Sequence, residues 1–290
     1  MAYQIFTDAF SNLPADLVEK LGIRVLPCVY FSDGVTVHYS GDLRQFDAHG
    51  FYDGMRAGKV ITTSLVNSQT FIDYFRLAVE AGEDVLYVGL SSGVSGTYQA
   101  SCIAAEELME EFPGRVIRTV DSLGAGLGTG LLTCLGADLR AEGLDVNAAA
   151  DTLVKERAKL CQFFTVGNLT YLRRTGRVSM ATAAIGNVLN IKPLLYGSDE
   201  GKIISCAKCR GRDKAMEAIV EKYAKKAVNP TQRRVAISHG DCLEDAQKLA
   251  EAVCAVAKPK ELIICPHEPF SGSHVGPGML ALFFFGDSRL

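Results

Sequence analysis

The sequence predicts an α/β protein of two domains, with a parallel sheet in an N-terminal domain (residues 1–160) and a mixed sheet in a smaller C-terminal domain (residues 161–290). A chain of 290 residues is long for one domain and can bury a large core. Up to residue 160, strand-like and helical segments alternate, which favours parallel strands joined by helical crossovers. Beyond that point the turn segment Ser198-Asp199-Glu200-Gly201 is typical of a hairpin.

The composition excludes several classes of protein. Hydrophobic residues make up 48% of the chain and charged residues 22%, as in an ordinary soluble globular protein. The formal net charge of −3 argues against nonspecific nucleic-acid binding, which depends on a basic surface. We expect no integral membrane segment and no signal peptide, because neither a long apolar run nor a basic, apolar leader is present. The nine cysteines are then expected to be reduced thiols of a cytoplasmic protein, and most lie in apolar or helical contexts (Cys102, Cys134, Cys161, Cys254).

Periodicity and turn residues place the elements of the N-terminal half. Gly22 closes the first helix, and Asp33-Gly34 is a turn signal between two hairpin strands. We expect strands at residues 3–6, 24–31, 35–39, 85–88 and 116–120. We expect helices at residues 15–21, 46–56, 68–81, 100–112, 131–141 and 146–160. The glycines at 124, 126, 128 and 130 permit close packing of backbone against backbone or against a ligand.

The C-terminal half is expected to hold fewer helices and more strands. We expect strands at residues 162–166, 191–196, 202–208, 233–238 and 261–265, and a final apolar run at 279–285. We expect helices at residues 180–189, 213–226 and 243–256. His274 is expected in a Gly/Pro turn, His-Val-Gly-Pro-Gly, whose glycines allow a ligand to approach closely.

The segment 89–99, Gly-Leu-Ser-Ser-Gly-Val-Ser-Gly-Thr-Tyr-Gln, is the first candidate site. It joins a buried strand to a helix, so hydroxyls and free backbone N–H groups gather at a helix N-terminus, where an anion is favoured. The spacing fits neither a dinucleotide fingerprint nor a P-loop. A carboxylate or a single phosphate is the expected ligand, and a simple helix cap is the alternative.

Other predicted strands also end in polar residues. Asp8, Thr63-Ser64 and Asp121-Ser122 follow strands, and the carboxyl ends of parallel strands lie along one edge of a sheet, where ligands bind. Thr63 and Ser95 could then offer two neutral hydroxyl donors to one anion. The alternative for Thr63 is again a cap of the next helix.

An enzymatic interpretation of the same loop also has to be considered. Ser95 could act as a nucleophile, with His274 as base and Asp121 as the orienting carboxylate of a serine esterase or acyl-transfer enzyme. The surroundings, Gly-Val-Ser-Gly-Thr, lack the second glycine of a nucleophile elbow. A binding module for a small phosphorylated ligand is a third possibility.

Three further features of the sequence point less clearly to a functional site than the loop at 89–99. Cys206 and Cys209 have C-x-x-C spacing, but no second ligand pair for zinc exists, and side chains on a strand would point to opposite faces. Arg210 could supply a fixed positive charge to an anion, whereas Arg212 is expected to be a solvated surface residue. The basic stretch 173–177 is expected to be solvated or to face a partner, because it lacks interleaved aromatic residues.

Taken together, these motifs resemble the DegV family of bacterial fatty-acid-binding proteins, which includes the FakB-type subunits of fatty acid kinase. The resemblance covers nearly the whole chain, in the order of the family. The matching pieces are Thr7-Asp8, Asn12-Leu13-Pro14, Thr63-Ser64, the segment 90–98, Val120-Asp121-Ser122, Tyr171-Leu172, the segments 176–179 and 187–193, Arg210 and the segment 274–278.

This resemblance implies a carrier and not an enzyme. One long-chain, palmitate-like fatty acid would lie in an apolar tunnel near the domain interface, with no other cofactor and no metal. By position, Thr63 and Ser95 would bind the carboxylate, Arg210 and His274 would act near the head group, and Ser64, Ser92, Gly96 and Asp121 would support them. A separate kinase would use ATP to form an acyl phosphate for phospholipid synthesis. Transient contact with a membrane is compatible with this role.

The chain departs from the family pattern at three places. The family's Thr-Ser-Gln-Pro is Thr63-Ser64-Leu65-Val66 here, and its early Asp-Ser-Thr is Asp8-Ala9-Phe10. A Gly-Gly-Arg is replaced by Thr175-Gly176-Arg177. None of these changes removes a predicted carboxylate ligand, but the first two bear on lipid preference.

Overall fold

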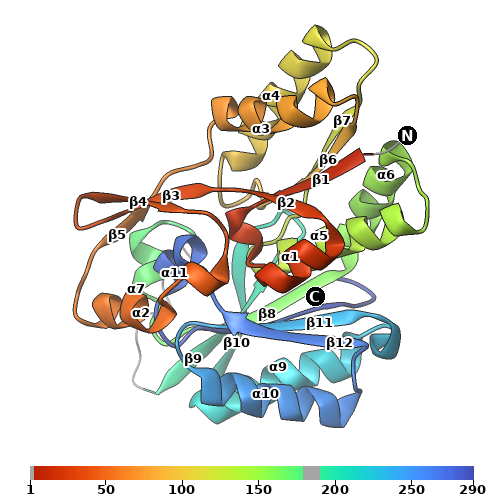
Figure 1. Ribbon diagram of the computed structural model, residues 1–290. Coiled ribbons are helices and arrows are strands. Elements are labelled where there is room, and N and C mark those ends of the chain that lie inside the picture. Colours follow the sequence, from red (N-terminus) through yellow and green to blue (C-terminus); the bar gives the residue numbers. More distant parts are fainter. Residues whose placement is uncertain (1–2, 179–189) are drawn as a thin grey trace.

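The computed structural model describes residues 3–178 and 190–290. It is a two-domain α/β fold with one parallel and one mixed sheet, and Figure 1 shows the two sheets one above the other. The strands are β1 (Tyr3–Asp8), β2 (Ile23–Leu26), β3 (Cys28–Ser32), β4 (Val35–Tyr39), β5 (Ile61–Thr63), β6 (Asp84–Gly89), β7 (Ile117–Asp121), β8 (Leu160–Thr165), β9 (Ile191–Gly197), β10 (Ile203–Arg210), β11 (Arg234–His239), β12 (Glu261–Pro266) and β13 (Leu280–Phe285). The helices are α1 (Ala15–Leu21), α2 (Ala48–Arg56), α3 (Ser68–Glu80), α4 (Thr97–Glu111), α5 (Leu127–Ala141), α6 (Val146–Glu156), α7 (Thr170–Arg174), α9 (Arg212–Lys226), α10 (Leu243–Val256) and α11 (Pro269–Val275).

The N-terminal sheet has the order β2-β1-β6-β7, and all its strands are parallel, as predicted. The second sheet has the order β10-β9-β8-β13-β11-β12, in which only β11 and β12 pair in parallel. The hairpin β9–β10 turns at the predicted segment 198–201. β8 begins at Leu160 and belongs to the second sheet.

Helix α5 joins the two sheets. It contacts β1 and β6 of the first sheet and β8, β11 and β13 of the second. Its glycines allow this close packing, since a Cβ on Gly130 would lie 2.6 Å from the Ser11 carbonyl oxygen and one on Gly128 would lie 2.3 Å from Gln162 Oε1. One apolar cluster therefore includes residues of both sheets, while α9 and α10 cover the far side of the second sheet (Figure 1).

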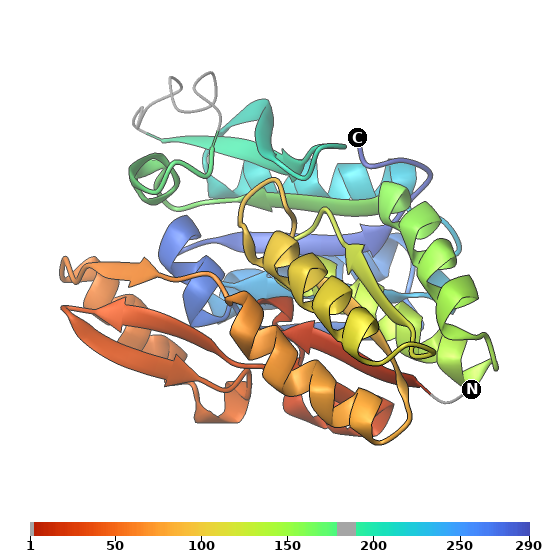
Figure 2. The same cartoon turned by 90° about the horizontal axis from the view of Figure 1, so that it is seen from above.

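A third, small sheet was not predicted. The expected strand 24–31 is broken at Pro27, which has no backbone N–H to donate. Before the proline, β2 joins the parallel sheet; after it, β3 pairs with β4 and β5 in an antiparallel sheet of order β4-β3-β5. This sheet and α2 form the projection at one side of the molecule in Figure 2. The prediction that the strand ending at Thr63 belongs to the parallel sheet is therefore wrong.

Two short helices were also missed, and one predicted helix lies outside the described residues. α7 and α11 are five and seven residues long, and their sequences show no helical period. The interpretation of His274 as a turn residue is wrong, because it lies in the last turn of α11, which Gly276 terminates with a φ of 78°. The predicted helix at 180–189 falls among the residues that the structure does not describe.

Candidate functional site

An apolar cavity of about 760 Å³, counting its opening to solvent, lies between the two sheets. The first sheet contributes the loops after β6 and β7, and the second contributes one face of its central strands. α11 and the segment after α7 complete the wall. The lining residues include Leu90, Val94, Leu123, Phe164, Leu172, Ile203, Phe270, Val275, Met279, Ala281 and Phe283.

The cavity wall is polar where α11 ends. His274 lines the cavity and is only 8% exposed. Its Nε2 lies 3.0 Å from the Thr63 hydroxyl, while its Nδ1 is buried without a hydrogen-bond partner. Burial, with a smaller effect of Arg177 and Arg174, lowers the pKa of His274 to about 4. The ring is therefore neutral at pH 7 and keeps one nitrogen free for a ligand.

Helix α11 is itself fixed by a buried carboxyl group. Glu268 is its N-cap and accepts hydrogen bonds from the backbone N–H groups of Phe270 (2.5 Å) and Ser271 (2.8 Å). Burial raises the pKa of Glu268 to about 7. The Phe270 ring packs on Phe10, with ring centroids 3.8 Å apart. These contacts hold the helix that carries His274 against the first sheet.

The loop after β6 is held by two carboxylates at the edge of the parallel sheet. Asp8 Oδ2 accepts from the Leu90 N–H (3.1 Å) and the Tyr87 hydroxyl (2.6 Å). Asp121 Oδ1 accepts from the N–H groups of Ser92 (3.2 Å) and Leu123 (2.9 Å). Burial raises the pKa of Asp8 to about 6. The predicted convergence of Asp8, Asp121 and this loop is confirmed, and both carboxylates serve to position it.

Ser95 lies where the loop enters α4 and is half-buried. Its Oγ is 3.0 Å from the Thr97 hydroxyl and accepts from the Thr97 N–H at 3.3 Å. Thr97 Oγ1 in turn accepts from the Val66 N–H at 3.3 Å, so the Ser95 loop and the segment after Thr63 are linked. Ser64, Ser92 and Gly96 are exposed around this junction.

No Ser–His–Asp chain forms among the described residues. His274 Nε2 is engaged by Thr63, and the Asp121 carboxylate accepts from backbone N–H groups. Ser95 is bonded to Thr97 and has no base within hydrogen-bond distance. The arrangement does not favour the esterase interpretation.

Arg210 and Arg212, the two arginines considered from the sequence, have different surroundings in the structure. Arg210 is exposed at the end of β10, where the described residues give it neither a hydrogen bond nor an ion pair, and it does not line the cavity. The expectation of a solvated Arg212 is wrong, because its Nε pairs with Asp245 at 2.8 Å and its Nη1 donates to the Gly278 carbonyl oxygen at 2.8 Å. Arg212 thus fixes the turn after α11.

Several cavity residues were not identified from the sequence. Arg177 was expected to be solvated or to face a partner, but it is half-buried and lines the cavity. Gln162, from an apolar strand, and His267, from the segment after β12, also line it, and neither gave a signal of a site.

The cysteines depart from expectation at one point. All nine are free, and Cys254 is exposed but lies in helix α10, within the expected apolar or helical contexts. Cys206 and Cys209 pack against the same apolar cluster, and not on opposite faces of β10, because the strand register shifts between Ser205 and Ala207. Burial raises the pKa of both thiols, which makes them poor metal ligands and weak nucleophiles.

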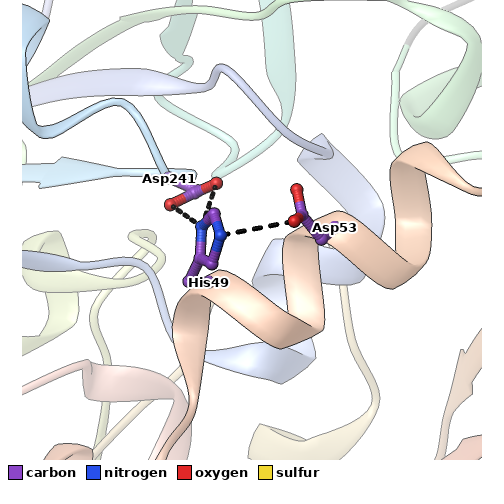
Figure 3. Close-up of side chains that lie close together, drawn as sticks. All are labelled: His49, Asp53 and Asp241. Carbon is purple, nitrogen blue, oxygen red and sulfur yellow. Dashed lines mark hydrogen bonds and ion pairs between the residues drawn. The ribbon is translucent and has the colours of Figure 1, made fainter.

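A second polar cluster lies away from the cavity. His49 and Asp53 of α2 lie beside Asp241, which follows β11, with His49 Nδ1 3.2 Å from the Asp241 carboxylate and Nε2 3.3 Å from that of Asp53 (Figure 3). The hydrogen bond to Asp241 raises the pKa of His49. Arg56 Nη1 also pairs with both carboxylates, at 2.6 and 2.5 Å. A metal ion would have to displace this guanidinium, so the cluster is best described as an ion-pair bridge between α2 and the second sheet.

Comparisons with known proteins place the chain among close relatives. A family model described as "Uncharacterised protein, DegV family" matches residues 2–287. A DegV domain-containing protein of Clostridium perfringens is 38% identical over 99% of this chain and 98% of its own length. A DegV family protein from Thermus thermophilus, described for its fatty acid binding, is 29% identical, with a TM-score of 0.87 over 99% of this chain and 100% of that one. A DegV lipid-binding protein from Thermotoga maritima is 26% identical, with a TM-score of 0.86 over the full length of both chains.

Proposed function

Because the chain belongs to the DegV family, we propose that it binds one long-chain fatty acid in the cavity between its sheets and acts as a carrier. The observation that carries the proposal is an apolar cavity whose wall includes a buried imidazole with a free nitrogen. The similar proteins from Thermus thermophilus and Thermotoga maritima, described as binding fatty acid and lipid, support it.

Burial of the acyl chain supplies the affinity. Each buried CH₂ contributes about 0.8 kcal/mol, so a palmitate-like chain contributes roughly 10 kcal/mol before the costs of association. The head group then needs partners for its charge, because a buried carboxylate without them is costly.

We assign the carboxylate to the Thr63–His274 end of the cavity. When the Thr63 hydroxyl donates to Nε2, Nδ1 of the neutral ring carries the proton and can donate to the carboxylate. Ser95, joined to this region through Thr97 and Val66, offers a second hydroxyl. Arg177 at the cavity wall supplies positive charge, and Ser64, Ser92, Gly96 and Asp121 support the loops.

We further propose that the carboxylate is presented to a separate ATP-dependent fatty acid kinase, which forms the acyl phosphate. The resemblance to FakB-type subunits and the exposed position of Arg210, free to contact another protein, support this step. The nine free thiols support a cytoplasmic location. Among the described helices, none has the length and apolar character needed to span a bilayer.

Binding of palmitate to lipid-stripped protein, measured by calorimetry, tests the head-group assignment. Thr63→Ala and Ser95→Ala should each weaken binding by about 1–3 kcal/mol, because the first removes the hydroxyl that keeps the proton on His274 Nδ1 and the second removes a donor to the buried charge. Thr63→Ser keeps the hydroxyl and should bind nearly as well as the unmodified protein.

Thr62→Ala is the matched control, since Thr62 is exposed on the same strand. If Thr63→Ala and Ser95→Ala bind palmitate as tightly as this control, the carboxylate does not lie at this end of the cavity.

A further inference from the structure

His267 lies in the wall of the same cavity, between β12 and α11. It is 4% exposed, and its backbone N–H donates to the His239 carbonyl oxygen at 2.8 Å. Burial, with a smaller contribution from His239, lowers the pKa of its ring to about 3. The cavity therefore contains a second neutral imidazole, which has no role in the proposed fatty-acid binding.

Only one nitrogen of the His267 ring is engaged by the protein. Nδ1 lies 3.0 Å from the Ser238 hydroxyl. The opposite nitrogen, Nε2, has no hydrogen-bond partner in residues 3–178 and 190–290, and, unlike His274 Nδ1, it is not a fully enclosed unpaired atom. The ring is packed against Gly126, where a Cβ would lie 2.6 Å from Cε1.

Two other polar side chains of the wall, Ser91 and Gln162, form hydrogen bonds within the protein. The Ser91 hydroxyl donates to the Gly201 carbonyl oxygen at 2.9 Å. Gln162 accepts from the Ala125 N–H at 3.0 Å and donates to the Leu123 carbonyl oxygen at 3.3 Å. The imidazole nitrogens of His274 and His267 remain, from opposite ends of α11, whose seven residues span about 10 Å.

We propose that His267 Nε2 binds an oxygen in the middle of the ligand's acyl chain, so that the cavity accepts a hydroxy fatty acid by two-point recognition. This inference rests on the proposed function, with the carboxylate at the Thr63–His274 end. A plain hydrocarbon chain would cover Nε2 and leave it unpaired, which is unfavourable for a buried polar group. A hydroxyl both donates and accepts, so it satisfies Nε2 in either tautomer.

The test compares octadecanoic acid with two isomers that carry one hydroxyl, either in mid-chain or at the methyl end. Affinities are measured by calorimetry for the lipid-stripped protein and for His267→Phe, an apolar ring of similar shape. The unmodified protein should prefer the mid-chain isomer over the isomer hydroxylated at the methyl end. His267→Phe should reduce that preference about tenfold, as expected for one lost hydrogen bond at a buried site.

A spectroscopic readout on the unmodified protein avoids dependence on the folding of the variant. With ¹⁵N-labelled histidine, the His267 Nε2 resonance should shift with the mid-chain isomer and not with octadecanoic acid. Equal affinities and no Nε2 shift would overturn the inference while leaving fatty-acid binding intact. If none of the three acids binds, the proposed function itself fails.

Discussion

His274 shows how one buried residue links stability to pH. Its ring is enclosed by α11, β5 and the cavity, so protonation would place a charge where little water reaches it. The pKa falls from 6.5 in the unfolded chain to about 4 in the folded protein. Between pH 6.5 and about pH 4, the folded state therefore binds fewer protons than the unfolded state. The stability that the neutral His274 ring contributes is lost as the pH falls through this range.

We predict that this contribution amounts to about 3 kcal/mol. The free energy of unfolding of the unmodified protein, relative to that of His274→Gln, should fall by this amount between pH 6.5 and pH 4. Urea unfolding of both proteins across the range measures the difference. If the difference in the free energy of unfolding between the two proteins does not change with pH, the His274 ring is not buried in a neutral state.

At the scale of single residues, the sequence identifies hydroxyl residues that follow predicted strands but not residues whose role depends on tertiary packing. Ser95 and Thr63 stand out because hydroxyls follow strands, and their linkage through Thr97 and Val66 lies in the structure. Arg177 and His267 acquire their meaning only from the tertiary packing that brings them to the cavity. No local pattern encodes that packing.

Among the elements, the contact between the β6–α4 loop and the β9–β10 hairpin closes one wall of the cavity. Ser91 donates to the Gly201 carbonyl oxygen, and Gly93 lies directly against the hairpin backbone. A Cβ on Gly93 would lie 2.5 Å from the Glu200 carbonyl oxygen and 2.7 Å from that of Gly201. Glycine is required at position 93 because the two backbones approach each other closely, and not because a turn conformation demands it.

Gly93→Ala should therefore destabilise the protein by about 1–3 kcal/mol, because backbone atoms of the hairpin would have to move. Gly96→Ala is the matched control in the same loop, since its nearest contact is 3.4 Å from Leu65 Cδ2. It should cost no more than about 1 kcal/mol. Equal thermal stability of the two variants would contradict the close contact.

Elements with a clear sequence pattern are easier to predict than elements without one. The helix at 15–21 and the helix at 243–256 were both predicted to the residue, the first closed by Gly22 and the second without a side-chain cap. α11 was missed, since its sequence of small residues and a histidine gives no helical pattern, and its N-cap Glu268 is buried by tertiary contacts. The split at Pro27 could have been anticipated from the missing donor alone.

Over the whole molecule, the two sheets are joined by a common core through α5. Leu132, fully buried on this helix, belongs to the apolar cluster that reaches from β1 to β13. The two domains are therefore expected to lose stability together. The order of the sheets and the third sheet depend on such distant contacts, which is why the sequence predicts the fold class but not these features.

Leu132→Ala should destabilise the protein by about 2–5 kcal/mol. Hydrogen exchange should become faster in β6 and in β13 by similar factors, because one cluster supports both strands. Protection lost in only one of the two strands would show that the domains unfold independently.

The central claim is that the cavity holds one long-chain fatty acid. Native mass spectrometry of the purified protein, before and after lipid extraction and after incubation with palmitate, tests it most directly. We expect a mass increment of a single fatty acid that extraction removes and palmitate restores. A folded protein that carries no fatty acid as purified and takes up none on incubation would contradict the claim.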